Sequence, residues 1–240
     1  PLIARVELSV AAALHTRSCS AEALARVPRL LKTFGAFDMK DELRKCQFLE
    51  GVALKDVGRR TDAIAKLTTL LTGACVADDP LVYGLALAQL GEAQASEGAL
   101  EDAARSFARA IPLIEEANAA WAIADCKAML GEILRDQGNV ESAIPLYRSA
   151  VQLKLSRRLD GAAAYLRIVL AEALMISGRE EEGAEEILAA LPILGREGLA
   201  PAATAALRLL HESARRREAD PDAVRRLRLE LQKMNERTHS

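Results

Sequence analysis

The stretch LGEILRDQGNVESAIPLYRSA, residues 130–150, holds the pattern that decides the fold. Its central glycine, Gly138, belongs to a column that recurs at every fortieth position, with Gly58, Gly98 and Gly178. Two columns of small residues keep the same step, seven positions before the glycine and five after it: Ala11, Gly51, Gly91, Gly131 and Ala171, and Ala23, Ala63, Ala103, Ala143, Gly183 and Ala223. A step of this size divides the chain into six similar units, which we expect to stack side by side.

Each unit has the pattern of two antiparallel helices joined at the glycine. Apolar residues with helical spacing precede Gly98 and follow it, and a glycine there can adopt the left-handed conformation that ends a helix. We therefore expect six helix pairs, with helices of roughly 14–19 residues. The small columns mark where two helix axes approach closely. A bulky column is expected to fill the space between neighbouring pairs: Val27, Leu67, Phe107, Tyr147, Ile187 and Leu227.

Capping residues and prolines predict where helices begin and bend. An acidic or hydroxyl side chain can cap a helix, and a proline suits the first helical position. Such signals stand at four places: Asp79–Pro80, Asp220–Pro221, Asp38 and Thr61. Proline inside a helix removes a backbone donor and bends the axis. Three prolines in predicted helices are expected to add curvature in this way: Pro112, Pro145 and Pro192.

Composition and charge restrict the class of protein. Half of the residues are hydrophobic but only 3% are aromatic, and the apolar share falls on Ala and Leu, which favours packed helices over strands. The formal net charge of −2 is too close to zero for bulk electrostatic capture of nucleic acid or an anionic membrane. Charges recur every few positions, so no membrane span is expected. No secretory signal is visible, and we expect a cytoplasmic protein, excised from a longer one.

The sequence predicts no catalytic centre, metal site or cofactor. The four cysteines, Cys19, Cys46, Cys75 and Cys126, are too widely spaced for a zinc or disulfide pattern. We interpret them as small apolar groups in a reducing environment. Local motifs for nucleophilic, metal-dependent or phosphate chemistry are missing from the sequence, and the regular glycines are accounted for by the repeat. The chain is therefore not expected to be an enzyme.

Two of the units resemble the tetratricopeptide repeat (TPR) family most fully, the third and the fourth. The matching residues of the fourth unit are Leu130, Gly131, Glu132, Gly138, Asn139, Ala143, Tyr147 and Ala150. The usual repeat has about 34 residues, so the longer unit is similar instead to repeats of kinesin light chains and MalT-like bacterial regulators. The resemblance implies an all-α right-handed superhelical solenoid of six antiparallel helix pairs. It would form one domain over residues 1–240, with repeats at roughly 1–38, 39–78, 79–118, 119–158, 159–199 and 200–240.

The resemblance also implies that the first helices of the pairs line a concave face that binds extended peptides. Counting from the first small column places Glu92, Glu132 and Glu172 in one row on this face, beside Lys55 and Arg135. Such a ladder of carboxylates would bind a basic peptide or helix through charge-assisted hydrogen bonds. Alternatively, each glutamate is solvated or paired within the chain, as Glu132 would be with Arg135. The same count places four more residues on this face: Lys45, Phe48, Asp125 and Asp136.

The fifth unit gives the same face an apolar end. Tyr165, Ile168, Met175 and Ile176 would form an interaction patch if they were exposed together. The alternative is that they pack against the first helix of the sixth unit, through Leu207 and its neighbours.

The C-terminal part of the sequence carries an arginine cluster: Arg215, Arg216, Arg217, Arg225, Arg226 and Arg228. The last three belong to the last predicted helix, around Val224, Leu227 and Leu231. Acidic residues interrupt the cluster, and no aromatic side chain is available for base stacking. We interpret it as the solvated face of a terminal capping repeat and do not expect a nucleic-acid site.

These patterns together favour a non-catalytic scaffold or sensor module that binds a protein or peptide through the concave face. The sequence does not name the partner beyond its expected basic character. The alternative is a regulatory segment of a larger bacterial transcription or signalling regulator, which would bind an inhibitor protein or a small molecule.

Overall fold

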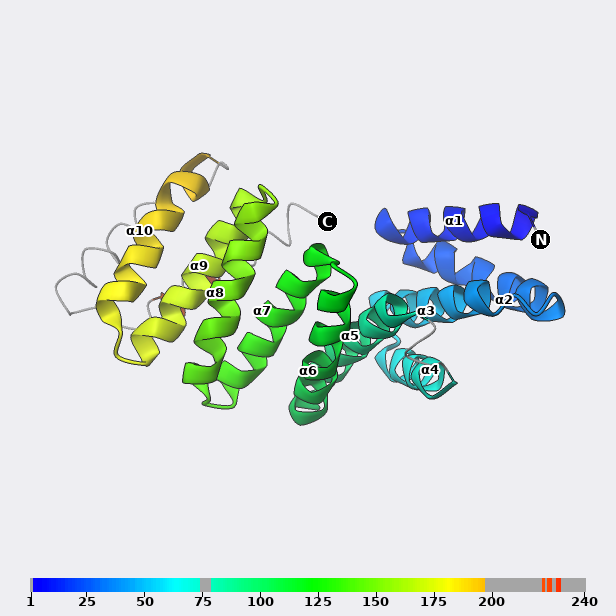
Figure 1. The fold of residues 1–240 in the computed structure, drawn as a ribbon, viewed down its shortest axis with the longest axis horizontal. Coiled ribbons are helices and arrows are strands. Elements are labelled where there is room, and N and C mark those ends of the chain that lie inside the picture. Colours follow the sequence, from blue (N-terminus) through cyan, green and yellow to red (C-terminus); the bar gives the residue numbers. More distant parts are fainter. Residues whose placement is uncertain (1, 74–78, 197–221, 223, 226–227, 230–240) are drawn as a thin grey trace. The chain divides into compact units, whose positions relative to one another are not determined.

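The computed structural model describes residues 2–73, 79–196, 222, 224–225 and 228–229. All regular secondary structure in these residues is helical. The helices are α1 (Leu2–Thr16), α2 (Ser20–Ala36), α3 (Lys40–Asp56), α4 (Arg60–Gly73), α5 (Pro80–Ser96), α6 (Leu100–Glu116), α7 (Ala120–Asp136), α8 (Val140–Ser156), α9 (Asp160–Ile176) and α10 (Glu180–Arg196). The five predicted pairs in this range are confirmed (Figure 1). The sixth falls largely outside the described residues.

The chain divides into two compact units, Pro1–Ala122 and Ile123–Ser240. In the first unit, consecutive helices from α1 to α6 pack against one another. In the second, α8 packs against α9 and α9 against α10.

A left-handed turn ends most of the described helices, and in the first, third and fourth repeats such turns occur twice rather than once. The predicted glycines Gly58, Gly98, Gly138 and Gly178 have φ between +78° and +82°. Between and before them, other residue types adopt the same conformation: Ser18, Asp38, Asn118 and Arg158. At Gly138 the backbone N–H of Asn139 donates to the carbonyl of Leu134 at 2.8 Å. This bond satisfies a carbonyl that the end of α7 would otherwise leave open.

Two of the predicted caps are wrong, and one is confirmed. The Asp79 carboxylate accepts a hydrogen bond from the backbone N–H of Val82 at 3.0 Å and caps α5. Asp38 is not a cap, because it is itself the left-handed turn residue and Met39 stands at the N-cap position of α3. Thr61 lies inside α4, which begins one residue earlier. Asp220–Pro221 lies outside the described residues.

The small columns lie at the contact between the two helices of a pair. A Cβ atom built on Gly91 of α5 would stand 2.9 Å from Cε2 of Phe107 in α6. Gly51 has the same relation to Leu67, and Gly131 to Tyr147. The bulky column therefore packs inside its own pair. Leu67 also joins a core cluster with Ala86 and Leu90 of the following pair, as the sequence predicts.

The structure places most of the remaining prolines and cysteines that the sequence singles out. The three prolines lie inside α6, α8 and α10, which continue through them. Cys46 and Cys126 are buried, whereas Cys19 is partly exposed; Cys75 lies outside the described residues. Burial raises the pKa of the Cys46 thiol to about 12. Among the described helices, none is both long enough and apolar enough to cross a membrane.

Candidate functional site

In the first unit, a lysine joins the first helices of two successive pairs. Nζ of Lys55 in α3 donates to Oε1 of Gln89 in α5 at 2.6 Å and forms an ion pair with Glu92. The Gln89 side chain also donates to Glu92, at 3.1 Å. Glu92 is thus paired within the chain, the second of the two interpretations that the sequence leaves open.

The corresponding pair two repeats later lies in the second unit, between α7 and α9. Nη1 of Arg135 stands 3.8 Å from Oε2 of Glu172. The Arg135 guanidinium also donates two hydrogen bonds to Oδ1 of Asp136, at 3.0 and 2.8 Å. Arginine and lysine therefore take the same place in the repeat, each facing a glutamate on the next first helix.

Glu172 has a second and closer cation, Arg228. Nε of Arg228 donates to Oε2 of Glu172 at 2.6 Å, and the two residues are only 6% and 1% exposed. The sequence places Glu172 on an open groove floor and Arg228 on a solvated cap. Glu172 is instead paired within the chain, the second of the two interpretations, although it is buried rather than exposed. The prediction of a solvated Arg228 is wrong, because its side chain is buried against Glu172. A buried pair of this kind needs such direct contact, since each charge alone would lose its hydration.

Glu132 of α7 is close to the same charges. Burial raises the pKa of Glu132, and Arg135 and Arg228 partly offset this effect. Three buried side-chain atoms among the described residues of this unit have no hydrogen-bond partner: Nη1 of Arg135, the hydroxyl of Tyr147 and Nε of Arg167. We call Glu132, Arg135, Asp136, Glu172 and Arg228 the α7/α9 charge cluster.

The predicted apolar end of the face is mostly covered. Ile168 and Met175 are 0% and 4% exposed and belong to a core cluster that includes Val224. Ile168 and Met175 therefore do not form an exposed patch, the first of the two alternatives. Tyr165 packs partly buried against the same cluster, whereas Ile176 remains 47% exposed. Leu207, the partner that the alternative names, lies outside the described residues.

The other predicted site residues do not join the charge cluster. Lys45 is exposed, and Phe48 packs against the cluster around Leu67. Asp125 is exposed and accepts a hydrogen bond from Nζ of Lys154 at 2.6 Å.

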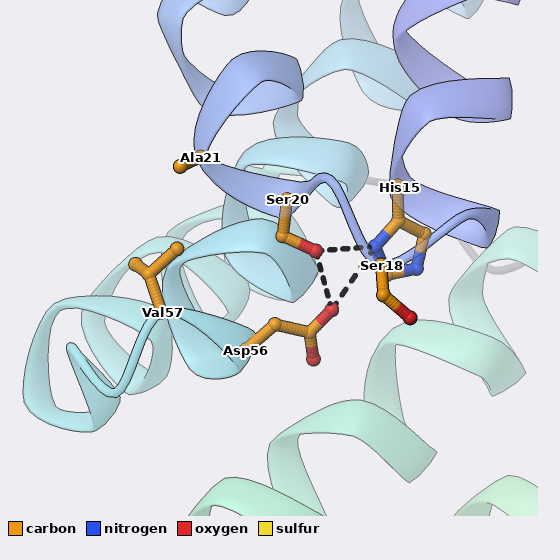
Figure 2. A pocket seen from close by; sticks show the side chains of 6 residues that line it. All are labelled: His15, Ser18, Ser20, Ala21, Asp56 and Val57. Atoms are coloured by element: carbon orange, nitrogen blue, oxygen red, sulfur yellow. Dashed lines mark hydrogen bonds and ion pairs between the residues drawn. The ribbon is translucent and has the colours of Figure 1, made fainter. Parts of the chain in front are cut away.

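The structure also brings together a serine, a histidine and an aspartate that the sequence patterns do not reveal. They line a pocket in the first unit (Figure 2). Ser20 Oγ donates to Oδ2 of Asp56 at 2.8 Å, and Nδ1 of His15 lies 3.0 Å from the same oxygen and 3.2 Å from Ser20 Oγ. Because His15 and Asp56 come from different repeats, no local motif could reveal this cluster.

The geometry of this cluster is structural rather than nucleophilic. In a hydrolytic triad the imidazole accepts the serine proton on one nitrogen while the carboxylate holds the other. Here serine and aspartate share Nδ1, and the serine proton is directed at the carboxylate. Burial alone would raise the pKa of Asp56, but the hydrogen bonds from His15 and Ser20 outweigh it and lower the pKa below its ordinary value of 3.8. The cluster therefore fastens the α1–α2 turn to the end of α3.

Comparison with known proteins identifies the repeat. Residues 126–160 match a family model described as tetratricopeptide repeat. This segment contains Gly131, Gly138 and Tyr147, the residues that set the contact and the turn of the fourth pair. Residues 126–160 are a tetratricopeptide repeat, and the fold of the chain is TPR-like. Its unit exceeds the usual length of about 34 residues. The reason is that α7 and α8 each have 17 residues, and three-residue connections follow them.

Solved structures share the TPR-like fold at low sequence identity. The apo form of RapI has a TM-score of 0.68 and 15% identity, covering 98% of this chain and 84% of its own. A Podospora anserina kinesin light chain protein with nearly identical TPR-like repeats has a TM-score of 0.62 and 14% identity, covering 82% and 97%. A Rap protein complexed with Competence and Sporulation Factor has a TM-score of 0.62 and 15% identity, covering 91% and 65%. No curated protein matches the chain.

Proposed function

We propose that the chain is a non-catalytic binding module whose α7/α9 charge cluster receives a positively charged side chain of a protein or peptide partner. The observation that carries this proposal is the contact of Arg228 with Glu172, 2.6 Å from Nε to Oε2 with Glu172 1% exposed. In this contact the guanidinium of Arg228 lies directly against α9, the first helix of the fifth pair. A planar guanidinium can donate several hydrogen bonds to carboxylates, which favours arginine over lysine as the bound group.

The balance of charge supports the same ligand. Apart from Arg228, the cluster contains three carboxylates, Glu132, Asp136 and Glu172, and one cation, Arg135. Without a second cation, Glu172 would be a buried carboxylate whose remaining partner is 3.8 Å away. An unpaired Glu172 carboxylate in this desolvated site would cost on the order of 3–5 kcal/mol. The site therefore favours occupation by a cation.

The unsatisfied atoms add a second requirement. Nη1 of Arg135 and the hydroxyl of Tyr147 are buried donors without a hydrogen-bond partner. An acceptor supplied by a partner, such as a backbone carbonyl or an amide oxygen, or else an ordered water, would satisfy them. The site is therefore suited to a peptide segment, which offers a carbonyl beside its charged side chain.

The fold is compatible with this function. The Rap protein complexed with Competence and Sporulation Factor has a similar helical framework. A second candidate function is a regulatory segment of a larger protein. This candidate is supported by the contact of Arg228 with Glu172. Because a residue of the same chain occupies the charge cluster, its release would control whether a partner can bind there.

A direct titration tests the binding function. The probes are two fluorescein-labelled helical peptides of alanine and glutamine, one with a single arginine and one with glutamine at that position. They are titrated by fluorescence anisotropy against the Arg228→Ala chain, in which the internal arginine is removed. We expect the arginine peptide to bind at least tenfold more tightly than the glutamine peptide.

The dependence on Glu172 completes this test. Glu172→Gln should abolish the preference for arginine, whereas Glu92→Gln, the same column position in the first unit, should preserve it. Circular dichroism checks that each variant remains helical. Equal binding of the two peptides, or a preference that survives Glu172→Gln, would overturn the proposal.

A further inference from the structure

Arg228 does not have the environment that the repeat gives to its position. Its counterparts in the five preceding repeats are all exposed: Pro28, Thr68, Ala108, Arg148 and Leu188. Arg228, by contrast, is 6% exposed and bonded to Glu172. The described residues around it are helical, and Arg225 and Leu229 are exposed. Arg228 therefore departs from the burial pattern of the repeat, whereas Arg225 is exposed like its counterparts.

Val224 and Arg228 cover both halves of the predicted binding surface. Val224 is fully buried in the cluster that contains Ile168 and Met175, the apolar end. Arg228 pairs with Glu172 in the row of carboxylates. Arg228 follows Val224 by four positions, and in a helix this spacing places both side chains on one face. Val224 is thus an apolar contact and Arg228 a charged contact on the α7/α9 surface, about one helical turn apart.

We propose that Val224 and Arg228 are an internal ligand that occupies the α7/α9 surface and competes with the partner. This inference rests on the proposed function, and it names the partner more closely: a helix with an apolar residue four positions before an arginine. A partner of this chemistry would replace Val224 against Ile168 and Met175, and Arg228 against Glu172. Binding is then regulated by the chain's own C-terminal residues.

The competition is strong because the internal ligand is tethered. A segment of the same chain meets its site in an intramolecular step, at a higher effective concentration than a free peptide reaches in dilute solution. A free peptide with the same contacts therefore binds the native chain weakly. Removing the arginine from the chain removes the competitor's charged contact and leaves Glu172 to pair with the incoming ligand.

The test uses the chain's own sequence as the probe. A fluorescein-labelled peptide of residues 218–234, EADPDAVRRLRLELQKM, is titrated into the native chain, the Arg228→Ala chain and the Arg225→Ala chain. Arg225→Ala is the matched control, because Arg225 is an exposed arginine of the same segment. We expect the Arg228→Ala chain to bind the peptide at least tenfold more tightly than the native chain, and the control to bind it like the native chain. A peptide carrying Arg228→Ala should bind at least tenfold more weakly than one carrying Arg225→Ala.

A second measurement does not depend on the folding of any variant. Adding the native peptide in excess to the native chain should speed hydrogen exchange at the amides of residues 222–229, because the peptide displaces them. Equal affinity of the native and Arg228→Ala chains, or exchange that stays unchanged at saturating peptide, would overturn the internal ligand. If the single-arginine peptide still binds through Glu172 in that case, the proposed function stands; if it also fails, both fall.

Discussion

The ring of Phe107 lies against the backbone of Gly91, so that a Cβ atom on Gly91 would come within 2.9 Å of Cε2. Phe107 is fully buried, and neighbouring groups restrict where its ring can move. The side chain of the second helix thus fits the space left by the glycine of the first. This relation repeats at Gly131 and Tyr147, where the corresponding distance to Cε1 is 2.7 Å.

Replacing Gly91 with alanine should destabilise the first unit. The added methyl group would overlap the Phe107 ring and force the helices apart, at a cost of about 1–3 kcal/mol. The control is Gly35→Ala in α2, where a Cβ meets nothing within 4 Å, so alanine should be neutral or slightly stabilising. Denaturant unfolding of both variants measures the difference. Equal stabilities would contradict the close contact between the helices.

Replacing Arg158 with glycine should stabilise the second unit. Arg158 has a φ of +57° between α8 and α9, a conformation that costs an L-residue with a side chain about 1–2 kcal/mol. Glycine avoids this cost but loses more freedom on folding, which leaves a gain of about 0.5–1 kcal/mol. Gly138→Ala, at the preceding turn, should have the opposite sign. Thermal melting of the two variants checks the prediction, and a loss of stability in Arg158→Gly would count against it.

Asp56→Asn should destabilise the first unit by about 1 kcal/mol at neutral pH, since the Asp56 side chain is a third exposed and its hydrogen bonds are partly screened. The folded state lowers the pKa of Asp56 below 3.8. Its contribution is therefore complete above that pH and is lost as the pH falls through the lowered value. Unfolding free energies of the native and variant chains should converge in acid. Asp62→Asn, at an exposed i,i+3 pair with Arg59, should have little effect at any pH. A difference between native and Asp56→Asn that grows in acid would show the opposite linkage.

Glu132→Gln should make the second unit more stable at neutral pH and weaken binding. Burial raises the pKa of Glu132, so the folded state holds its proton more tightly than the unfolded chain does. Stability therefore falls as the pH rises from the ordinary value of 4.5 through the raised one. Glutamine imitates the protonated form and avoids this loss. The same variant in the Arg228→Ala chain should bind the arginine peptide about tenfold more weakly, a loss of about 1.4 kcal/mol. A variant that is less stable and binds normally would mean that Glu132 is a structural residue.

The sequence predicts the helix pairs well because glycine makes the left-handed turn inside four of them. The glycines at Gly58, Gly98, Gly138 and Gly178 make the turn inside each of their pairs visible. The turns between pairs escape prediction because Asp38, Asn118 and Arg158 share the left-handed conformation but no common side chain. Asp38 is mistaken for a cap for the same reason, since aspartate suits both places.

Only those contacts of the site that follow the 40-residue repeat could be predicted from the sequence. The spacing correctly places Glu172 near Arg135, because both follow the regular step of the repeat. It places Arg228 at an exposed position, where the regular units have exposed residues. The contact of Arg228 with Glu172 joins residues 56 positions apart outside that step, and no local pattern encodes it. The contact of His15 with Asp56 escapes in the same way, because it spans two repeats.

The central claim is that Glu132 and Glu172 select an arginine. The most direct test is a peptide array in which one position of a helical peptide is varied through all twenty amino acids and probed with the Arg228→Ala chain. Arginine should give the strongest signal and lysine a weaker one, and the Glu132→Gln, Glu172→Gln double variant should lose this order. A flat profile, a preference for acidic residues, or the same order in the double variant would contradict the claim.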